Sequence, residues 1–386
     1  MTVIALPVTR LRSLPTAAAA CLLSFTVFWC AQRAADVSMI DLMVYRAEGG
    51  AVRAGQDLYA MRTTAARLPT TYPPFAALLF TPLTLLGVAE MRALVTLENL
   101  ALLVALVHLS LRLAGRRAPE STLWISALAV WCEPVWTTLR YGQINLLLAV
   151  AVLWDLTRKD GHRWAGVALG LAAAVKLTPA FFVLHLLLAA VVRRPCRRPA
   201  ALAVAVFTAA TFTAAAVLPY DSQRFWTDAV FTASRVGHAE DTANQSLRGV
   251  LARLLHTGDP GLWWAAAAAL AAAAGLTVAV RAELRGERAA AVAACAATAL
   301  LVSPVSWSHH WVWCVPVLVL LGTYARGPAA AAWLLFCSYA LWWVPHGPAR
   351  PELAQNIGQM TLSALYPLTA VALLVGLWRA QAVAKE

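Results

Sequence analysis

Charged side chains are scarce in this chain, where Asp, Glu, Lys and Arg make up only 13% of the 386 residues. That scarcity, with 61% hydrophobic residues and a mean hydropathy of +0.66, excludes a soluble domain with a single membrane anchor. The apolar runs are about 15 to 22 residues long, recur to the C-terminus and are rich in Ala, Leu and Val. They lack the alternation of barrel strands, so we expect an all-α polytopic membrane protein.

The sequence also lacks the patterns that indicate several other classes. Its seven cysteines form no CxxC pair, so neither a zinc site nor a disulfide framework is indicated. No clear small-residue cleavage site follows the first apolar run, so we expect that run to remain as a helix. The net charge of +12 suggests nucleic acid, but most basic residues lie in short loops, where they set membrane orientation. Without a domain boundary or a convincing repeat, residues 1–386 are expected to form a single domain with no nucleic-acid partner.

The apolar piece at 73–88 is short and broken by prolines, and the topology depends on whether it crosses the membrane. If it crosses, the later basic loops lie outside; if it dips in and returns, most of the 31 Lys and Arg residues fall in inner loops, as the positive-inside rule requires. The second option is favoured, with 73–88 re-entrant, about twelve transmembrane helices and both termini in the cytoplasm. The predicted spans are 14–31, 91–113, 120–139, 143–157, 163–176, 178–192, 200–218, 262–280, 289–303, 310–323, 328–345 and 361–379, with long outer loops at 33–90 and 219–261.

The stretch from Val37 to Tyr59 follows the first span and is too polar for lipid, yet apolar residues recur in it with helical spacing. Its acid Asp41 comes shortly after the membrane exit, where a general base could take a proton from an arriving hydroxyl. The alternative is an N-cap or interface carboxylate on an amphipathic helix. Asp57 is a rival acid, but the sequence GQDLY around it is typical of a turn.

Cationic candidates stand at two other places on the predicted outer face. Lys176 lies in a proline-bounded break between apolar spans, where a charge is costly and indicates function, with a phosphate as its natural partner. The alternative is a lysine that reaches to the interface. His309 and His310 open another span and could bind a phosphate or a divalent ion, although adjacent histidines point to different sides of a helix. The alternative places both in an interfacial aromatic belt.

Four amide side chains also open predicted helices on the outer face. They are Gln143, Asn145, Asn244 and Gln245. Amides suit sugar hydroxyls because each offers donors and an acceptor, and helix capping is the alternative. Glu133, which precedes a proline, is interpreted as structural.

Seven short motifs stand in order along the chain: DLMVY at 41–45, GQDLY at 55–59, YPPF at 72–75, YGQIN at 141–145, KLTP at 176–179, NQSL at 244–247 and SPVSWSHHW at 303–311. Together they resemble glycosyltransferase family 87, a group of actinobacterial membrane proteins of the GT-C class. That family includes polyprenyl-phosphate-mannose-dependent alpha-1,2-mannosyltransferases that build phosphatidylinositol mannosides and lipoarabinomannan. The C-terminal portion is short and carries no matching motif.

The resemblance implies a GT-C fold and inverting transfer of a hexose, above all mannose, at the outer face of the plasma membrane. The donor would be a polyprenyl-phosphate sugar such as decaprenyl phosphomannose, and the acceptor a glycolipid or lipoglycan among membrane lipids. Polyprenyl phosphate leaves without a proton, so inversion needs one base, which Asp41 matches. The donor phosphate would be bound by Lys176, His309, His310 and Arg46, and the sugar or acceptor by Tyr72, Gln143, Asn145, Asn244 and Gln245. No cofactor is expected, and the sequence leaves a divalent metal open.

Two other functions compete with this interpretation. A lipid-linked sugar flippase or other transporter should show repeated halves and polar residues at mid-span, whereas the polar clusters here gather at one membrane face. A structural subunit of a cell-wall complex would leave Asp41 and the two histidines without a role. The transferase interpretation requires Asp41, Lys176 and His309 or His310 to line one cavity.

Overall fold

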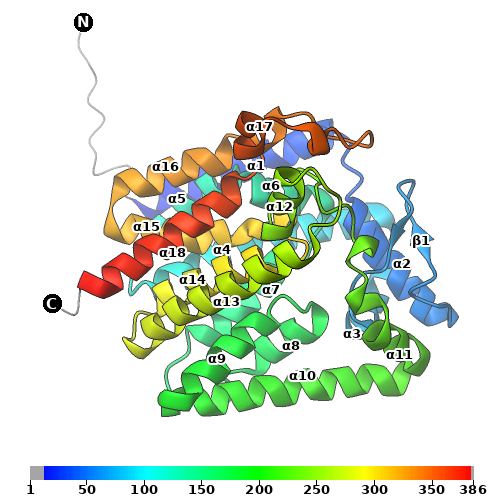
Figure 1. Ribbon diagram of the computed structural model, residues 1–386, viewed down its shortest axis with the longest axis horizontal. Coiled ribbons are helices and arrows are strands. Elements are labelled where there is room, and N and C mark those ends of the chain that lie inside the picture. The colour runs from blue at the N-terminus through cyan, green and yellow to red at the C-terminus, as the bar shows by residue number, and fades with distance from the viewer. Residues whose placement is uncertain (1–12, 384–386) are drawn as a thin grey trace, which may run out of the picture.

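Helices make up most of the computed structural model, which describes residues 13–383 (Figure 1). The α-helices are α1 (Leu14–Ala34), α2 (Ile40–Ala54), α3 (Pro74–Phe80), α4 (Val88–Leu113), α5 (Pro119–Ala129), α6 (Glu133–Tyr141), α7 (Asn145–Leu156), α8 (Val167–Val175), α9 (Ala180–Val192), α10 (Arg197–Val217), α11 (Pro219–Thr227), α12 (Leu247–Leu254), α13 (Gly261–Leu284), α14 (Arg288–Val302), α15 (Cys314–Tyr324), α16 (Arg326–Cys337), α17 (Ile357–Leu362) and α18 (Leu365–Val383). The 3-10 helices are η2 (Thr81–Leu85), η3 (Arg194–Cys196), η4 (Ala229–Phe231), η5 (Ala233–Arg235), η6 (Ser308–Trp313), η7 (Ala340–Trp343) and η8 (Pro351–Ala354). Strands β1 (Arg62–Thr63) and β2 (Leu68–Pro69) form a short antiparallel hairpin after α2. The all-α class is confirmed.

Five helical segments of the described chain are long and apolar enough to cross a membrane. They are Leu14–Ala34, Val88–Leu113, Arg194–Val217, Gly261–Leu284 and Leu365–Val383. The pair α6 and α7 makes a sixth if its 116° bend is a break within one span. Other predicted spans, such as those that became α8 and α9, fold as shorter helices. Length and composition therefore do not confirm twelve crossings.

The predicted span at 120–139 is divided into two helices. α5 ends at Ala129 and α6 begins at Glu133, with Cys132 in extended backbone (φ −63°, ψ 131°) between them. Pro134 stands in the first turn of α6, where its missing N–H would have had no partner in the helix. A proline at that position favours a new start, so one predicted helix becomes two.

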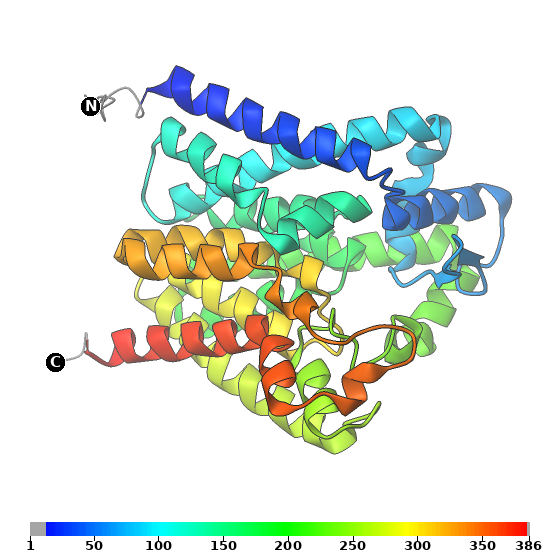
Figure 2. The same cartoon turned by 90° about the horizontal axis from the view of Figure 1, so that it is seen from above.

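The first and last described helices begin and finish at the same end of the bundle. In Figures 1 and 2, α1 starts and α18 finishes at the left, whereas α2, the β hairpin and α11 lie at the right, which we call the α2 end. α3 and η2, the predicted re-entrant piece, pack against α2 at that end, and α4 leaves from there (Figure 2). The chain therefore passes along the bundle an even number of times.

α14 is a deeply buried helix of the bundle core, and its Ala-rich sequence allows that burial. Nearly every one of its side chains is buried, and small side chains let neighbouring backbones approach closely. A Cβ placed on Gly275 of α13 would lie 1.9 Å from the Thr298 hydroxyl oxygen of α14, so the two helices meet there through glycine. The chain leaves α14 at the α2 end and continues into η6.

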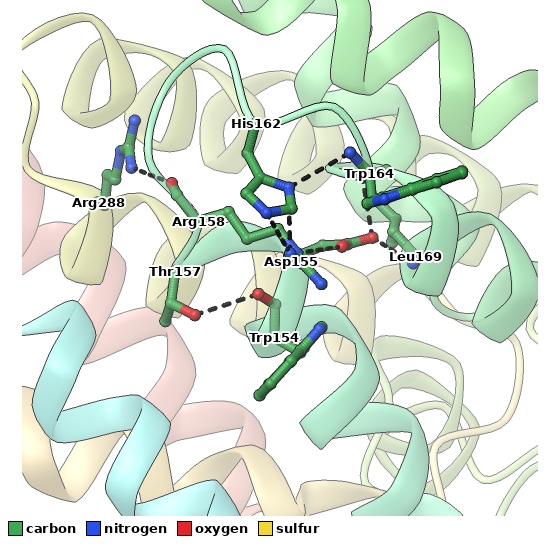
Figure 3. Close-up of polar contacts among 9 residues, drawn as sticks. Trp154, Asp155, Thr157, Arg158, His162, Trp164, Leu169 and Arg288 are labelled. Atoms are coloured by element: carbon green, nitrogen blue, oxygen red, sulfur yellow. Dashed lines mark hydrogen bonds and ion pairs between the residues drawn. The ribbon is translucent and has the colours of Figure 1, made fainter.

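Charged loops close the opposite end of the bundle (Figure 3). The Asp155 carboxylate of α7 accepts hydrogen bonds from the backbone N–H groups of Gly166 (3.0 Å) and Leu169 (2.8 Å), around the start of α8. Arg158 pairs with the same carboxylate at 3.3 Å, and Arg288 donates to the Arg158 carbonyl oxygen at 2.9 Å. These arginines belong to the loops predicted to face the cytoplasm, and their charges hold helix ends together.

Candidate active site

A cavity of about 920 Å³ opens at the α2 end of the bundle. Its wall comes from α2, the segment 68–73, the break between α8 and α9, and η6. Its polar lining side chains are Asp41, Tyr45, Thr71, Tyr72, Tyr141, Gln143, Lys176, Thr178, Thr232, Ser303, Ser308, His309 and His310. Cavities of this size with a few polar groups hold small ligands. The acid, the lysine and both histidines therefore line one space.

Asp41 stands in the first turn of α2 and is partly buried. Its Oδ2 accepts a hydrogen bond from Gln143 Nε2 at 2.6 Å, and α2 has no side-chain cap, so the capping alternative does not apply. Burial raises the pKa of Asp41 above its ordinary value, while the Gln143 amide and the Lys176 charge partly offset that rise. A carboxylate with a raised pKa is a stronger base, which suits proton abstraction.

The orientation of Gln143 is fixed from its other side. Its Oε1 accepts hydrogen bonds from the hydroxyl groups of Tyr45 (2.7 Å) and Tyr72 (3.1 Å), whose oxygens lie 2.8 Å apart. The amide N–H is thereby left for Asp41. Gly142 directly precedes Gln143 and caps the C-terminus of α6. Its φ of +67° is a conformation that glycine adopts without strain.

Lys176 lies in extended backbone between α8 and α9, as the proline-bounded break predicted. Its Nζ donates to Asn145 Oδ1 at 3.0 Å and to the Tyr72 hydroxyl at 3.4 Å, and lies 3.1 Å from His310 Nε2. It also lies 5.3 Å from the centre of the Tyr72 ring. The lysine thus turns into the protein and not toward an interface. Asn145 contacts it from outside the cavity lining.

The two histidines meet the cavity on η6 with their rings nearly perpendicular, 4.8 Å apart. The backbone oxygen of His309 accepts hydrogen bonds from the Thr138 hydroxyl (2.8 Å) and Asn145 Nδ2 (3.0 Å). Its ring packs edge-on against Tyr141, and its buried Nε2 has no partner among the described residues. An open ring nitrogen in the cavity wall is available to a ligand.

A buried carboxylate holds η6 in place. Glu133 accepts hydrogen bonds from the hydroxyl groups of Ser308, Thr137 and Tyr366, each at 2.8 Å. The indole N–H of Trp342 donates to it at 3.2 Å. With four donors around a fully buried side chain, this residue supports the wall that carries the histidines, in agreement with the structural interpretation of Glu133.

Besides Asn145, three predicted site residues lie outside the cavity lining. Arg46 donates to a backbone carbonyl oxygen at 3.2 Å and does not line the cavity. Asn244 and Gln245 are fully buried, and their amide groups donate to backbone carbonyl oxygens at 2.9 and 2.7 Å. The Asn244 Oδ1 also accepts from the backbone N–H of Ser306 at 3.0 Å, so these amides anchor the loop before η6. Sequence alone does not distinguish an amide that faces a ligand from one that faces backbone.

Several polar residues that line the cavity were not among the predicted site residues, and two of them, Tyr45 and Tyr141, contact Gln143 and His309 respectively. Tyr45 follows Asp41 by one helical turn, and that spacing was the available signal for a shared face. Tyr141 belongs to the YGQIN motif, but no function was predicted for it. Asp57, the rival acid, accepts the backbone N–H groups of Tyr59 and Ala60 in a turn, as interpreted. Across residues 13–383, no three His, Cys, Asp or Glu side chains are grouped to hold a metal.

The family model of glycosyltransferase family 87 matches residues 71–304. That range contains Gln143, Lys176 and much of the cavity wall, and it begins after α2. No solved structure matches the chain significantly.

Curated mycobacterial proteins are also similar. The chain is 38% identical over 279 residues to the polyprenol-phosphate-mannose-dependent alpha-(1-2)-phosphatidylinositol pentamannoside mannosyltransferase of Mycobacterium tuberculosis, covering 70% of this chain and 62% of that protein, less than two thirds of its length. It is 34% identical over 329 residues to the corresponding phosphatidylinositol mannoside mannosyltransferase of the same species, covering 79% and 76%. The Mycolicibacterium smegmatis protein of the latter name is 35% identical over 316 residues, covering 74% and 70%. With the family pattern running through more than half of its length and these relatives aligned over most of it, the chain belongs to glycosyltransferase family 87.

Proposed function

We propose that this protein is an inverting glycosyltransferase that moves mannose from a polyprenyl-phosphate donor to a glycolipid or glycan acceptor outside the plasma membrane. The observation that carries the proposal is the cavity in which Asp41 lies opposite a group of cationic and imidazole side chains. A chain of hydrogen bonds through Gln143 and Tyr72 links the acid to Lys176. The names of the relatives support the donor, and the phosphatidylinositol mannosides in those names support a glycolipid acceptor.

In the proposed reaction Asp41 takes the proton of the acceptor hydroxyl as that oxygen attacks the anomeric carbon of mannose. The bond from that carbon to the phosphate oxygen breaks on the opposite face, and its electron pair leaves with the polyprenyl phosphate. Lys176 and the two histidines stabilise the charge that builds on the phosphate. One carboxylate is enough, because the leaving group needs no proton.

The apolar part of the cavity supports a lipid-linked donor. Leu177 lines it from the break before α9, Phe181 and Leu184 line it from α9, and Ala299 and Val302 line it from α14. Leu184 is 40% exposed, so this wall is open at its surface. A polyprenyl chain would lie along it and bring its phosphate to Lys176.

The proposal includes a GT-C fold with about twelve crossings, the α2 end outside the cell and no cofactor. The common end of α1 and α18 supports two termini on one side (Figure 1). The paired arginines at the opposite end lie in the loops assigned to the cytoplasm. Tyr72 and Gln143 would contact sugar hydroxyls, while Asn145, Asn244 and Gln245 support the cavity from behind and Arg46 supports α2.

Replacing the proposed base is the decisive test. Asp41→Asn keeps the hydrogen-bonding shape but removes the proton acceptor, so transfer should fall by about 10²–10⁴-fold. The assay is transfer of radiolabelled mannose from polyprenyl phosphomannose to a panel of phosphatidylinositol mannosides by purified protein. Asp57→Asn is the matched control, because that acid lies outside the cavity lining, and it should stay within a few fold of the wild type. Wild-type transfer by Asp41→Asn would refute the assignment.

A further inference from the structure

A second acid lies on the same face of α2 as the proposed base. Asp41, Tyr45 and Glu48 follow one another at intervals of one turn. The Glu48 side chain is fully buried, and neither of its carboxyl oxygens has a partner in good hydrogen-bond geometry in the described chain, although the Thr70 hydroxyl lies close enough to lower the pKa of the carboxyl. Buried carboxyl groups are normally paired or hydrogen-bonded, as Glu133 is here, so Glu48 needs an explanation.

The described surroundings of Glu48 contain acids and phenols but no fully buried cation. On α2 itself, Arg46 is partly buried and donates to the Leu86 carbonyl oxygen, and Arg53 is exposed and donates to the Thr84 hydroxyl. Asp41 and Tyr45 come from α2 itself, and Tyr59, Thr70 and Tyr72 come from the segment after it. α3 and η2, which pack closely on α2, have no ionisable side chain between residues 74 and 85. The cations on the other elements packed against α2 are Arg62 of β1 and Arg140 of α6, and both are exposed.

Glu48 cannot reach water by a small shift of its helix. A Cβ on the neighbouring Gly49 would lie only 2.5 Å from the Phe80 carbonyl oxygen, so α2 and α3 are in backbone contact there. The Glu48 carboxyl group is therefore enclosed where α2 packs against α3, and a negative charge there would have no buried counterion among the described residues.

We propose that Glu48 holds a proton while Asp41 is ionised, so that it positions the base as a neutral neighbour, and that loss of this proton sets the alkaline limit of transfer. The inference rests on the proposed role of Asp41. Ionised Glu48 would put a second anion in the same dry layer. α2 would then have to move to hydrate it, and Asp41 would leave the Gln143 amide.

The environment of Glu48 gives the expected pH range. Burial raises the pKa of Glu48 to about 8; the Thr70 hydroxyl partly offsets that rise, and the charge of Asp41 adds to it. An acid whose pKa is raised by folding makes the folded state less stable as pH rises from its unfolded pKa to its folded pKa. For Glu48 that interval runs from about 4.5 to about 8.

The first arm of the test measures stability and needs no transfer assay. Glu48→Gln is isosteric and neutral, so its melting temperature should exceed that of the wild type by a margin that widens from about pH 5 to about pH 8 and then stays constant. Glu48→Met is a second neutral variant in case the amide is poorly tolerated. Glu287→Gln, at an exposed glutamate without a side-chain cap bond, is the control and should follow the wild type at every pH. Parallel curves for Glu48→Gln and the wild type would overturn the proposal.

The second arm measures mannose transfer against pH. The wild type should lose activity near pH 8, and Glu48→Gln should keep near-normal transfer at neutral pH and extend its alkaline limit by at least about one pH unit. An unchanged limit in Glu48→Gln would reject the link to catalysis. If the wild type transfers no mannose, the proposed function fails, and the melting curves still decide whether Glu48 is protonated.

Discussion

At the scale of single residues, the lysine between α8 and α9 makes three polar contacts at the cavity. Lys176 contacts Asn145, Tyr72 and His310, and its charge is among the influences that lower the pKa of Asp41. A cation in this position can favour the ionised base on one side and the departing phosphate on the other. One side chain can serve both roles because the cavity places the proposed base and the donor phosphate near the same lysine.

Lys176→Met should lower transfer on the order of 10²-fold, because it removes a positively charged donor from the leaving phosphate. Lys176→Arg should recover only part of that loss, since a planar guanidinium does not match contacts arranged around an ammonium. Turnover with saturating donor measures the effect. Lys159→Met is the control, because that lysine is exposed in the loop at the opposite end. A normal turnover in Lys176→Met would contradict the phosphate-binding role.

Residue chemistry predicted the centre of the site better than its edges. A lysine in a break between apolar spans is costly, and the joint placement of Lys176, Asp41 and the histidines on the predicted outer face indicated a common site. Arg46, Asn244 and Gln245 have equally suitable side chains, but they bond backbone carbonyl oxygens. Backbone partners leave no mark in the sequence, so such residues cannot be separated from ligand-binding ones in advance.

At the scale of elements, the site depends on the bend between α6 and α7. The two helices make an angle of 116°, and Gly142 at φ +67° stands at the turn. A Cβ there would lie 2.7 Å from the Leu42 Cβ of α2. The sequence predicted a helix start near Gln143 but not this close passage of α2, because the spacing of apolar residues does not report which helices touch.

Gly142→Ala should destabilise the protein by about 1–3 kcal/mol and reduce transfer, because it combines left-handed strain with a clash against the helix that carries Asp41. Gly286→Ala separates the two causes, since Gly286 has φ +78° with open space around its missing Cβ. Denaturation midpoints and transfer rates measure both effects. Equal loss of stability and activity in the two variants would show that the contact with α2 has no consequence.

At the scale of the whole molecule, the described chain begins and finishes at one end and places its cavity at the other. Exposed apolar side chains are spread over α1, α10 and α13, as expected for helices that face lipid. Sequence hydropathy predicted this class, whereas the described helices that are long enough to span do not by themselves confirm the predicted twelve crossings. Short apolar runs give the same hydropathy signal whether they span a membrane or pair inside a bundle.

The proposed orientation predicts different labelling of the two ends in intact cells. A cysteine at exposed Ala60, near the cavity, should react with a membrane-impermeant maleimide, whereas one at Lys159 should react only after permeabilisation. The unsubstituted chain measures the background from its own cysteines. The reverse pattern would place the cavity on the cytoplasmic side.

The break between α8 and α9 also has a consequence for how the protein is made. Both helices are short, and Lys176 sits at the tip of the hairpin that they form. Synthesis proceeds from the N-terminus, so Tyr72 and Asn145, which accept hydrogen bonds from Lys176, are made before this tip. The hydrogen-bond acceptors of the Lys176 ammonium group are therefore present when the α8–α9 hairpin inserts. The lysine need not stay unpaired in the hydrocarbon region during membrane insertion.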